Sequence, residues 1–403
     1  MNNTIHTDFL QYQAQTTPHP LGLAISHAKG SYIYDSYGNA YLDFIAGVSA
    51  NTMGHGHKKI KEAIINQVEK YMHVMVYGEF ALSPTVELSK KLTQFLPHPN
   101  QWSVYLTNSG TEATEGAIKL AKRVTGKQQV IAAENAYHGN TQGAMSVCGN
   151  TTQTQAYRPL IPGVKFIKFN NISDLNKIDH NTAAVILETI QGGAGFITPK
   201  GDYLKQVKEK CQKVGALLIL DEIQTGTGRT GTFFGFENYG ICPDIIITGK
   251  GLGGGMPIGA FIAKKEHMNL LQHHPALGHI TTFGGNPVVA AAALATIKTL
   301  QEEQLMQTIS SKEKLFRKLL RHPKILEIRG KGLMLAIMVK NAELATKIIL
   351  KAKERRLLLF WLLYEKNAIR ITPPLTISKK EIEKGCEILL ECINEVFAKP
   401  VDN

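Results

Sequence analysis

The sequence predicts an α/β protein with a mostly parallel central sheet and a smaller second domain. Between about residues 104 and 263, short apolar runs alternate with stretches of helical periodicity, which is typical of strands covered by helices on both faces. After about residue 300 the pattern changes to longer helices with a few short strands. The chain has 403 residues, 43% of them apolar, and is therefore long and apolar enough for two folded domains.

The central region predicts its elements in a regular order. Apolar runs predict strands over residues 104–106, 130–133, 183–187, 216–220, 245–247 and 258–262. Helices are expected over 112–123 and 202–214, because apolar residues in the second stretch recur at helical spacing. Strands that alternate with helices in this way favour parallel pairing.

The two ends of the chain predict a second, smaller α+β domain. Helices are expected over 288–300, 312–320, 342–355 and 379–397, with strand-like runs at 332–339 and 357–363. The stretch 32–43, with SYGNA as its turn, predicts a hairpin that joins this part rather than the central sheet. We therefore expect residues 1–55 and 300–403 to build the small domain and residues 56–299 to form the large one.

The charge of the chain is strongly positive but dispersed. The formal net charge is +12, from 45 Lys and Arg against 33 Asp and Glu. The lysines are scattered along helical stretches rather than gathered in a stripe with interleaved aromatic residues, so we expect no nucleic-acid partner. A positive field still favours anionic substrates and phosphorylated cofactors.

Cysteine usage and apolar patterning indicate a cytoplasmic protein. The five cysteines show no CxxC spacing, which favours reduced thiols in a reducing compartment. The first residues lack the basic-then-apolar pattern of a secretory signal, and no uninterrupted apolar run is long enough to span a membrane. The sequence therefore predicts no membrane partner. It also predicts no bound metal, because no histidine pair stands at the spacing of metal ligands on a helix.

Polar residues with chemical potential follow the ends of several predicted strands, where ligands bind in open α/β sheets. Ser109, Gly110 and Thr111 precede a predicted helix, so hydroxyls and free amides could form a cup for a phosphate. Taken alone, this stretch is better explained as a plain helix N-cap with acidic residues near the start of the helix.

Carboxylates and one lysine follow the next strands. Glu188 and Asp221 each end a buried strand, where a carboxylate is costly without a cationic partner. Asp221 could hold a protonated ring nitrogen or a metal, or could cap the next helix. Lys250 follows an apolar strand and precedes a glycine-rich turn, so partial desolvation should lower its pKa and make it a nucleophile or base. A structural ion pair between Lys250 and Asp221 is the alternative.

Together, these residues are the set that pyridoxal phosphate requires: a phosphate cup, an aspartate for the ring nitrogen and a nucleophilic lysine. The chain resembles the class III, fold-type I aminotransferases, which include acetylornithine, ornithine, 4-aminobutyrate and other ω-amino acid aminotransferases. The motifs that carry the resemblance are YDSYGNAYLDFIAGVSANTMGHGH, SGTEATEGAIKLAKR, AYHGNT, LETIQGGAG, LILDEIQTGTGRTG, PDIIITGKGLGGGMPIGA, TTFGGNPVVAAAALA and IRITPPLTIS.

The resemblance implies a role for each matching residue. Lys250 would form the Schiff base with pyridoxal phosphate, and Asp221 would pair with the pyridine nitrogen. The remaining expected contacts are the phosphate cup (Ser109, Gly110, Thr111), the ring (Tyr137, with His138 beside it), the phenolic oxygen (Gln224), a supporting carboxylate (Glu188), the phosphate of the neighbouring subunit (Thr282) and the substrate α-carboxylate (Arg370). Thr282 therefore implies a homodimer with shared active sites.

Three departures from the family pattern concern the substrate. Gly193 stands where acetylornithine and ornithine members have a glutamate that masks the carboxylate-binding arginine, so Arg370 should stay unmasked. Thr114 replaces an asparagine of the phosphate-cup helix, and the stretch 73–84 differs from the short pattern of the acetylornithine group.

The resemblance implies an aminotransferase that moves an amino group from an ω-amino acid or amine donor to 2-oxoglutarate or pyruvate. An amino-acid epimerase or aminomutase on the same scaffold is the chemical alternative, since it uses the same lysine and aspartate. A catalytically silent binding protein is the alternative from another class, and the presence of both Lys250 and Asp221 argues against it.

Overall fold

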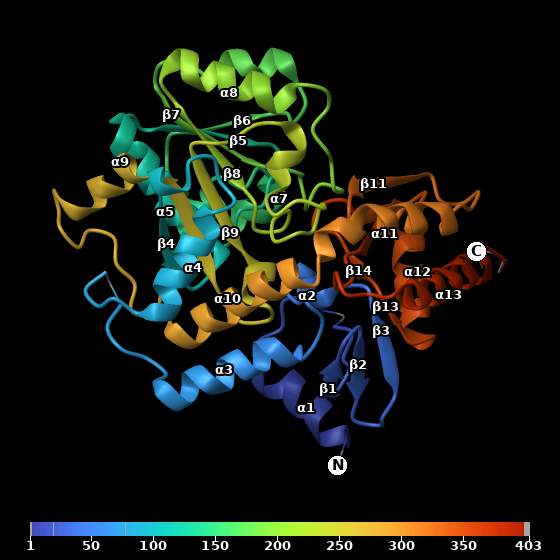
Figure 1. Ribbon diagram of the computed structural model, residues 1–403. Helices are drawn as coiled ribbons and strands as arrows, with labels where there is room; N and C mark the ends of the chain where they lie inside the picture. Colours follow the sequence, from blue (N-terminus) through green and yellow to red (C-terminus); the bar gives the residue numbers. More distant parts are fainter. Residues whose placement is uncertain (1, 19, 77, 399–403) are drawn as a thin grey trace.

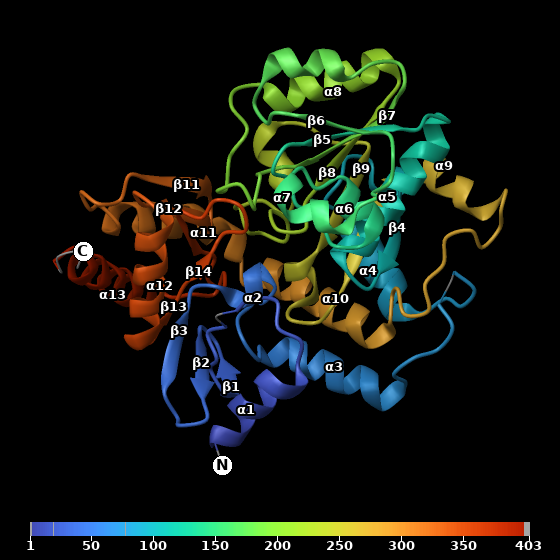
Figure 2. The same ribbon diagram turned by 180° about the vertical axis from the view of Figure 1, so that it is seen from behind.

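The computed structural model describes residues 2–18, 20–76 and 78–398. Two units lie side by side, a large one around the central sheet and a smaller one formed by the C-terminal segment, with the N-terminal hairpin below them (Figures 1 and 2). Within the described residues, no helix combines the length and the apolar character needed to cross a membrane.

The central sheet has seven strands and is mostly parallel, as predicted. Its order is β4 (Trp102–Thr107), β10 (Gly259–Lys264), β9 (Ile245–Gly249), β8 (Leu217–Asp221), β7 (Thr182–Glu188), β5 (Gln129–Ala133) and β6 (Val164–Ile167). The pairings from β9 to β6 are parallel, whereas β10 runs antiparallel to both of its neighbours. Every residue of β7 and β9 is buried, as expected of strands that helices cover on both faces.

Helices on both sides of this sheet bury its apolar faces (Figures 1 and 2). The long helices of the large unit are α3 (Lys58–Lys70), α4 (Ser83–Thr93), α5 (Gly110–Thr125), α8 (Tyr203–Val214) and α10 (Pro287–Glu302). The α5 helix packs on β7, β9 and β10, α8 packs on β7 and β8, and α10 packs on α3 and α4.

The chain before residue 273 holds further helical segments, most of them short. The α-helical ones are α1 (Asn2–Tyr12), α2 (Ala46–Ser49), α6 (Gln142–Ser146), α7 (Thr151–Thr154) and α9 (Lys265–Met268). The 3₁₀ turns are η1 (Pro99–Gln101), η2 (Gln155–Tyr157), η3 (Ile172–Lys177), η4 (Gly235–Tyr239), η5 (Lys250–Gly253) and η6 (Asn269–Gln272).

The C-terminal segment forms a small sheet with helices packed on it. The order of this sheet is β11 (Glu327–Lys331), β12 (Met334–Met338), β15 (Ala368–Ile371) and β14 (Phe360–Trp361), with all pairings antiparallel. Its helices are α11 (Leu305–Leu319), α12 (Ala342–Glu354) and α13 (Lys379–Ala398). The α11 helix begins seven residues before the stretch that the sequence predicted.

The predicted N-terminal hairpin is present and joins the C-terminal segment. β1 (Ile25–Lys29), β2 (Tyr32–Asp35) and β3 (Ala40–Asp43) pair antiparallel, and β3 then pairs parallel with β13 (Leu357–Leu358). The two ends of the chain therefore share one sheet.

The topology brings the ends of four strands to one edge of the central sheet. β7, β8 and β9 are parallel, so their carboxyl ends meet there, and Glu188 and Asp221 are register partners. β4 runs in the same direction as β9, because β10 is antiparallel to both. The start of α5 therefore lies beside the end of β9.

Candidate active site

A cavity of about 1060 Å³ opens at this edge of the sheet. Most of the predicted site residues line it, namely Gly110, Thr111, Tyr137, His138, Glu188, Asp221, Gln224, Lys250 and Arg370. Two do not: Ser109 lies just outside the lining, and Thr282 is exposed on the segment before α10. The chain therefore brings residues from both of its units to one hollow.

Lys250 stands at the point where β9 becomes the η5 turn. Its backbone has a φ of 42°, in the left-handed region that a lysine seldom adopts, so the fold stabilises a locally strained conformation there. Burial lowers the pKa of the Lys250 amine, and Arg370 lowers it further, while Asp221 and Glu188 act in the opposite direction. The result is an amine that gives up its proton more readily than a lysine in water.

Asp221 is fixed from two sides at the end of β8. Its Oδ2 lies 2.7 Å from His138 Nδ1, and its Oδ1 accepts a hydrogen bond of 2.9 Å from the backbone N–H of Ile223. This contact assigns a proton to Nδ1 of His138, because the carboxylate can only accept. The segment after Asp221 forms a series of turns, so Asp221 does not cap a helix. Its carboxylate is held rigidly at the cavity wall.

Glu188 occupies the equivalent position at the end of β7. Its Oε1 accepts from the N–H of Tyr137 at 3.1 Å, and its Oε2 accepts from the N–H of Gly192 at 2.7 Å. Burial raises the pKa of Glu188 to about 7, and these two hydrogen bonds only partly offset that effect. Glu188 therefore fixes the segments that carry Tyr137 and Gly192.

The first turn of α5 forms the proposed anion cup. The Ser109 hydroxyl accepts from the N–H of Glu112 at 3.3 Å, which is an ordinary N-cap contact. The N–H groups of Gly110 and Thr111 lie in the first turn, where a helix offers them no partner of its own. A Cβ on Gly110 would lie 2.5 Å from Cδ1 of Ile223, so only glycine fits there without displacing that side chain.

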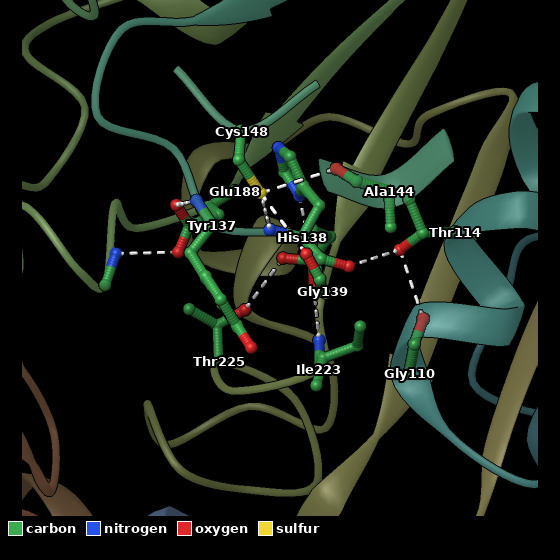
Figure 3. A network of polar contacts seen from close by, with 12 residues as sticks. Gly110, Thr114, Tyr137, His138, Gly139, Ala144, Cys148, Glu188, Ile223 and Thr225 are labelled. Atoms are coloured by element: carbon green, nitrogen blue, oxygen red, sulfur yellow. Dashed lines mark hydrogen bonds and ion pairs between the residues drawn. The ribbon is translucent and has the colours of Figure 1, made fainter. Parts of the chain in front are cut away.

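Thr114 ties this helix to the loop that carries Tyr137 and His138. Its buried hydroxyl lies 3.1 Å from the carbonyl oxygen of Gly110 and 3.0 Å from that of His138 (Figure 3). Because a hydroxyl has one proton, Thr114 donates to one of these carbonyls at a time. The Thr114 hydroxyl is thus a polar link between the first turn of α5 and this loop.

Arg370 reaches the cavity from β15 of the C-terminal unit. Its side chain is buried, and its Nε and Nη1 atoms have no hydrogen-bond partner among the described residues. The guanidinium lies 5.5 Å from the centre of the Phe196 ring, and burial lowers its pKa to about 10, which still leaves it charged at neutral pH. A buried guanidinium with unpaired donors has the geometry and charge to bind a carboxylate.

Two features of the site were not predicted from the sequence. Glu222, next to Asp221, is fully buried and accepts four hydrogen bonds, and Tyr364 lines the cavity from the segment between β14 and β15. No motif singles out either residue. Position alone hinted at Glu222, since it directly follows a strand end that carries chemistry.

The residues present fit pyridoxal phosphate. The cavity offers a lysine amine of lowered pKa, a rigid aspartate and the start of a long helix to one ligand. Within the described part of the chain, no group of three or more His, Cys, Asp or Glu side chains is arranged to hold a metal ion.

Comparison with known proteins gives a consistent result. The family model described as "Aminotransferase class-III" matches residues 12–393. The acetylornithine aminotransferase of Caldanaerobacter subterraneus subsp. tengcongensis is 38% identical over 382 residues, which cover 91% of this chain and 94% of that protein. The [LysW]-aminoadipate semialdehyde/glutamate semialdehyde transaminase of Sulfurisphaera tokodaii is 37% identical over 90% of this chain and 93% of its own length. Among solved structures, the ornithine aminotransferase from Toxoplasma gondii ME49 superposes with a TM-score of 0.91 at 30% identity, covering 98% of this chain and 96% of that one.

Proposed function

Because the chain belongs to the class III aminotransferase family, we propose that it moves an amino group from an ω-amino acid or amine donor to 2-oxoglutarate or pyruvate. The chain is a pyridoxal-phosphate-dependent aminotransferase of fold type I. The proposal concerns its substrates and the part that each residue plays.

Besides Lys250, which would bind the cofactor covalently, seven residues would contact it or orient the residues that do. The first turn of α5, with Gly110 and Thr111, would receive the phosphate, and Ser109 supports it by capping the helix. Asp221, oriented by His138, would pair with the ring nitrogen. Tyr137 and Gln224 also line the cavity and would contact the ring and its phenolic oxygen. When bound, pyridoxal phosphate supplies an electron sink for the amine-bearing carbon of the donor.

Lys250 is the residue that we propose moves the proton. Its Nζ takes the proton from the amine-bearing carbon of the donor, because burial lowers the pKa of this amine and so favours its basic, unprotonated form. Asp221 and Glu188 favour the protonated form of the lysine and Arg370 disfavours it. The amine is therefore placed between opposing charges that permit both gain and loss of the proton.

The single observation that carries the substrate proposal is the pair of unpartnered nitrogen atoms on buried Arg370. A planar guanidinium binds a carboxylate through two parallel hydrogen bonds. Arg370 faces the same cavity as Lys250 and lies close enough to influence its pKa. An oxo acid bound by its carboxylate at Arg370 would thus present its carbonyl near Nζ of Lys250.

The similar proteins support an ω-amino donor. They are an acetylornithine aminotransferase, a [LysW]-aminoadipate semialdehyde/glutamate semialdehyde transaminase and an ornithine aminotransferase. Two nitrogen atoms of buried Arg370, however, have no hydrogen-bond partner among the described residues. This supports a donor whose own carboxylate can also use Arg370.

We further propose a cytoplasmic homodimer with shared active sites. Thr282 is exposed and lies outside the cavity of its own chain, as is required of a residue that reaches a neighbouring subunit.

The shared sheet of β3 and β13 supports the division into a small domain, residues 1–55 with 300–403, and a large domain, residues 56–299.

A labelling experiment tests the proposed reaction. Candidate donors carrying isotope-labelled nitrogen are incubated with the cofactor-loaded enzyme and unlabelled 2-oxoglutarate or pyruvate, and the products are analysed by mass spectrometry. The proposal expects the label in newly formed glutamate or alanine. Recovery of the donor with inverted stereochemistry and no transferred label would instead identify an epimerase.

A further inference from the structure

Gly193 and Tyr364 lie in direct contact at the wall of the active-site cavity. The carbonyl oxygen of Gly193 accepts hydrogen bonds from the N–H of Tyr364 at 2.9 Å and from that of Glu365 at 3.2 Å. A Cβ on Gly193 would lie 2.9 Å from Cδ2 and 3.0 Å from Cε2 of the Tyr364 ring. The ring therefore lies directly over the α-carbon of Gly193.

The ring of Tyr364, rather than the backbone, requires glycine at this position. Gly193 is not among the residues with positive φ, so its backbone conformation is open to any residue. A side chain at 193 would have to displace the ring of Tyr364, although the backbone N–H of Tyr364 is hydrogen-bonded to the carbonyl oxygen of Gly193. Gly193 is thus matched to the ring of Tyr364.

Tyr364 separates two hollows of the molecule. It lines the active-site cavity, and it also lines a second cavity of about 320 Å³ together with Glu134, Lys168 and Arg329. Among the described residues it is the only one that lines both. The two linings therefore meet at Tyr364, which we call the partition.

The partition faces the reaction centre. Tyr364 belongs to the segment between β14 and β15, and β15 carries Arg370. Burial raises the pKa of Tyr364, and nearby Cys148, Glu188 and Tyr137 raise it further, so its hydroxyl stays protonated and uncharged. An uncharged ring edge limits the cavity without competing for the charge on Arg370.

We propose that Tyr364, seated on Gly193, determines substrate specificity by setting the maximum length of the acid that Arg370 can hold in the cavity. The inference rests on the proposed binding of a carboxylate by Arg370. Short amino and oxo acids fit in front of the ring. Longer chains meet the ring and are excluded, although a polar cavity with Lys168 and Arg329 lies directly behind it.

Binding of unreactive dicarboxylates to the cofactor-loaded enzyme tests this length limit. Affinities for succinate, glutarate, adipate and pimelate are measured by calorimetry, so that the readout is binding and not turnover. In the unaltered protein we expect affinity to fall by on the order of tenfold for each methylene beyond the limit. Tyr364→Ala should remove that fall, because it joins the two cavities.

Three further variants separate length selection from a general structural effect. Tyr364→Phe keeps the ring and should keep the limit. Gly193→Ala displaces the ring and should change the limit. In the Tyr364→Ala background the same substitution should have no further effect, because the Cβ then has no ring to meet. Tyr37→Ala, in the exposed turn between β2 and β3 and away from both cavities, should leave all affinities unchanged.

The outcomes distinguish this inference from the function on which it rests. If no dicarboxylate binds the unaltered enzyme, the role of Arg370 is wrong. If dicarboxylates bind but a folded Tyr364→Ala protein shows the same fall in affinity at the same length, the proposal that Tyr364 sets the length limit is wrong. If Tyr364→Ala does not fold, Gly193→Ala decides the question, since an unchanged length profile in that variant contradicts the proposal.

Discussion

Replacing Glu222 by glutamine tests how the loop behind Asp221 is held. Oε1 of Glu222 accepts from the Thr189 hydroxyl at 2.5 Å and from the N–H of Phe236 at 2.9 Å. Oε2 accepts from the Thr225 hydroxyl at 2.7 Å and from the N–H of Gly235 at 2.6 Å. Each oxygen therefore faces one hydroxyl, which can rotate, and one backbone N–H, which cannot.

A glutamine cannot satisfy this set of donors in either orientation. Its NH₂ group must face the N–H of Phe236 or that of Gly235, and that buried donor then loses its acceptor. The expected cost is about 1–3 kcal/mol. With an unfolding entropy of about 2 cal/mol/K per residue, a cost of about 2 kcal/mol lowers the melting temperature of this chain by about 2 °C.

The assay is thermal unfolding of Glu222→Gln at about pH 8. Burial raises the pKa of Glu222 to about 7, so the carboxylate is ionised at pH 8 and accepts all four hydrogen bonds. At about pH 5 the carboxyl carries a proton of its own, and the difference from glutamine should shrink.

Glu237→Gln is the matched control for this measurement. Glu237 lies in the same segment and accepts a single hydrogen bond, from the N–H of Phe234 at 2.6 Å, so the amide oxygen of glutamine can replace it. We expect a change of less than about 0.5 kcal/mol. If Glu222→Gln is as stable as Glu237→Gln at pH 8, the account of the four donors is wrong.

Three further predictions follow from the site. Arg370→Ala should raise KM for the oxo acid at least about tenfold. Arg370→Lys should raise KM less, because an ammonium keeps the charge but lacks the paired donors. Equal steady-state kinetics in the unaltered protein and both variants would contradict a role of Arg370 in substrate binding. Thr114→Val should weaken cofactor affinity, measured by titration of the apoenzyme, whereas Thr114→Ser should retain it, because only serine keeps the hydroxyl that links Gly110 to His138. The pKa of folded Glu188 is raised from 4.5 to about 7, so the apoenzyme should lose stability as pH rises through about 7, and Glu188→Gln should flatten that dependence in urea unfolding at several pH values; an unchanged slope would contradict the assignment.

The strands that hold the site could be predicted because they are buried on both faces. The runs at 183–187 and 245–247 are almost purely aliphatic, and the strands β7 and β9 extend each of them by one or two residues. The edge strand β6 was not predicted, because Val164–Ile167 includes a lysine and is mostly part-exposed. β11, with the sequence EIRGK, has no apolar run at all.

Long-range pairing could not be predicted from local pattern. The antiparallel insertion of β10 between β4 and β9 is a property of the whole sheet, and nothing in residues 258–262 indicates it. The contact between Gly193 and Tyr364 has the same character. Gly193 was recognised as a departure from a family pattern, but the sequence does not say which distant ring takes the space of the missing side chain.

Within the site, the residues that follow strand ends could be located from the sequence, whereas a residue at a subunit interface could not. Lys250, Asp221 and Glu188 follow buried strands, so topology alone brings them to one edge of the sheet. That Lys250, Asp221 and Glu188 bind the cofactor and act on the substrates stays a prediction. The role of Thr282 also stays a prediction, because this residue would act on a neighbouring subunit.

The most direct test of the central claim is the visible absorption spectrum of the protein with pyridoxal phosphate, recorded while amine donors are added without an oxo acid. We expect the yellow band of the bound cofactor to bleach with ω-amino donors, to return when 2-oxoglutarate or pyruvate is added, and to be absent or altered in Lys250→Ala. A band that forms but is bleached by no donor would contradict amino-group transfer. A spectrum that Lys250→Ala leaves unchanged would contradict the assignment of Lys250.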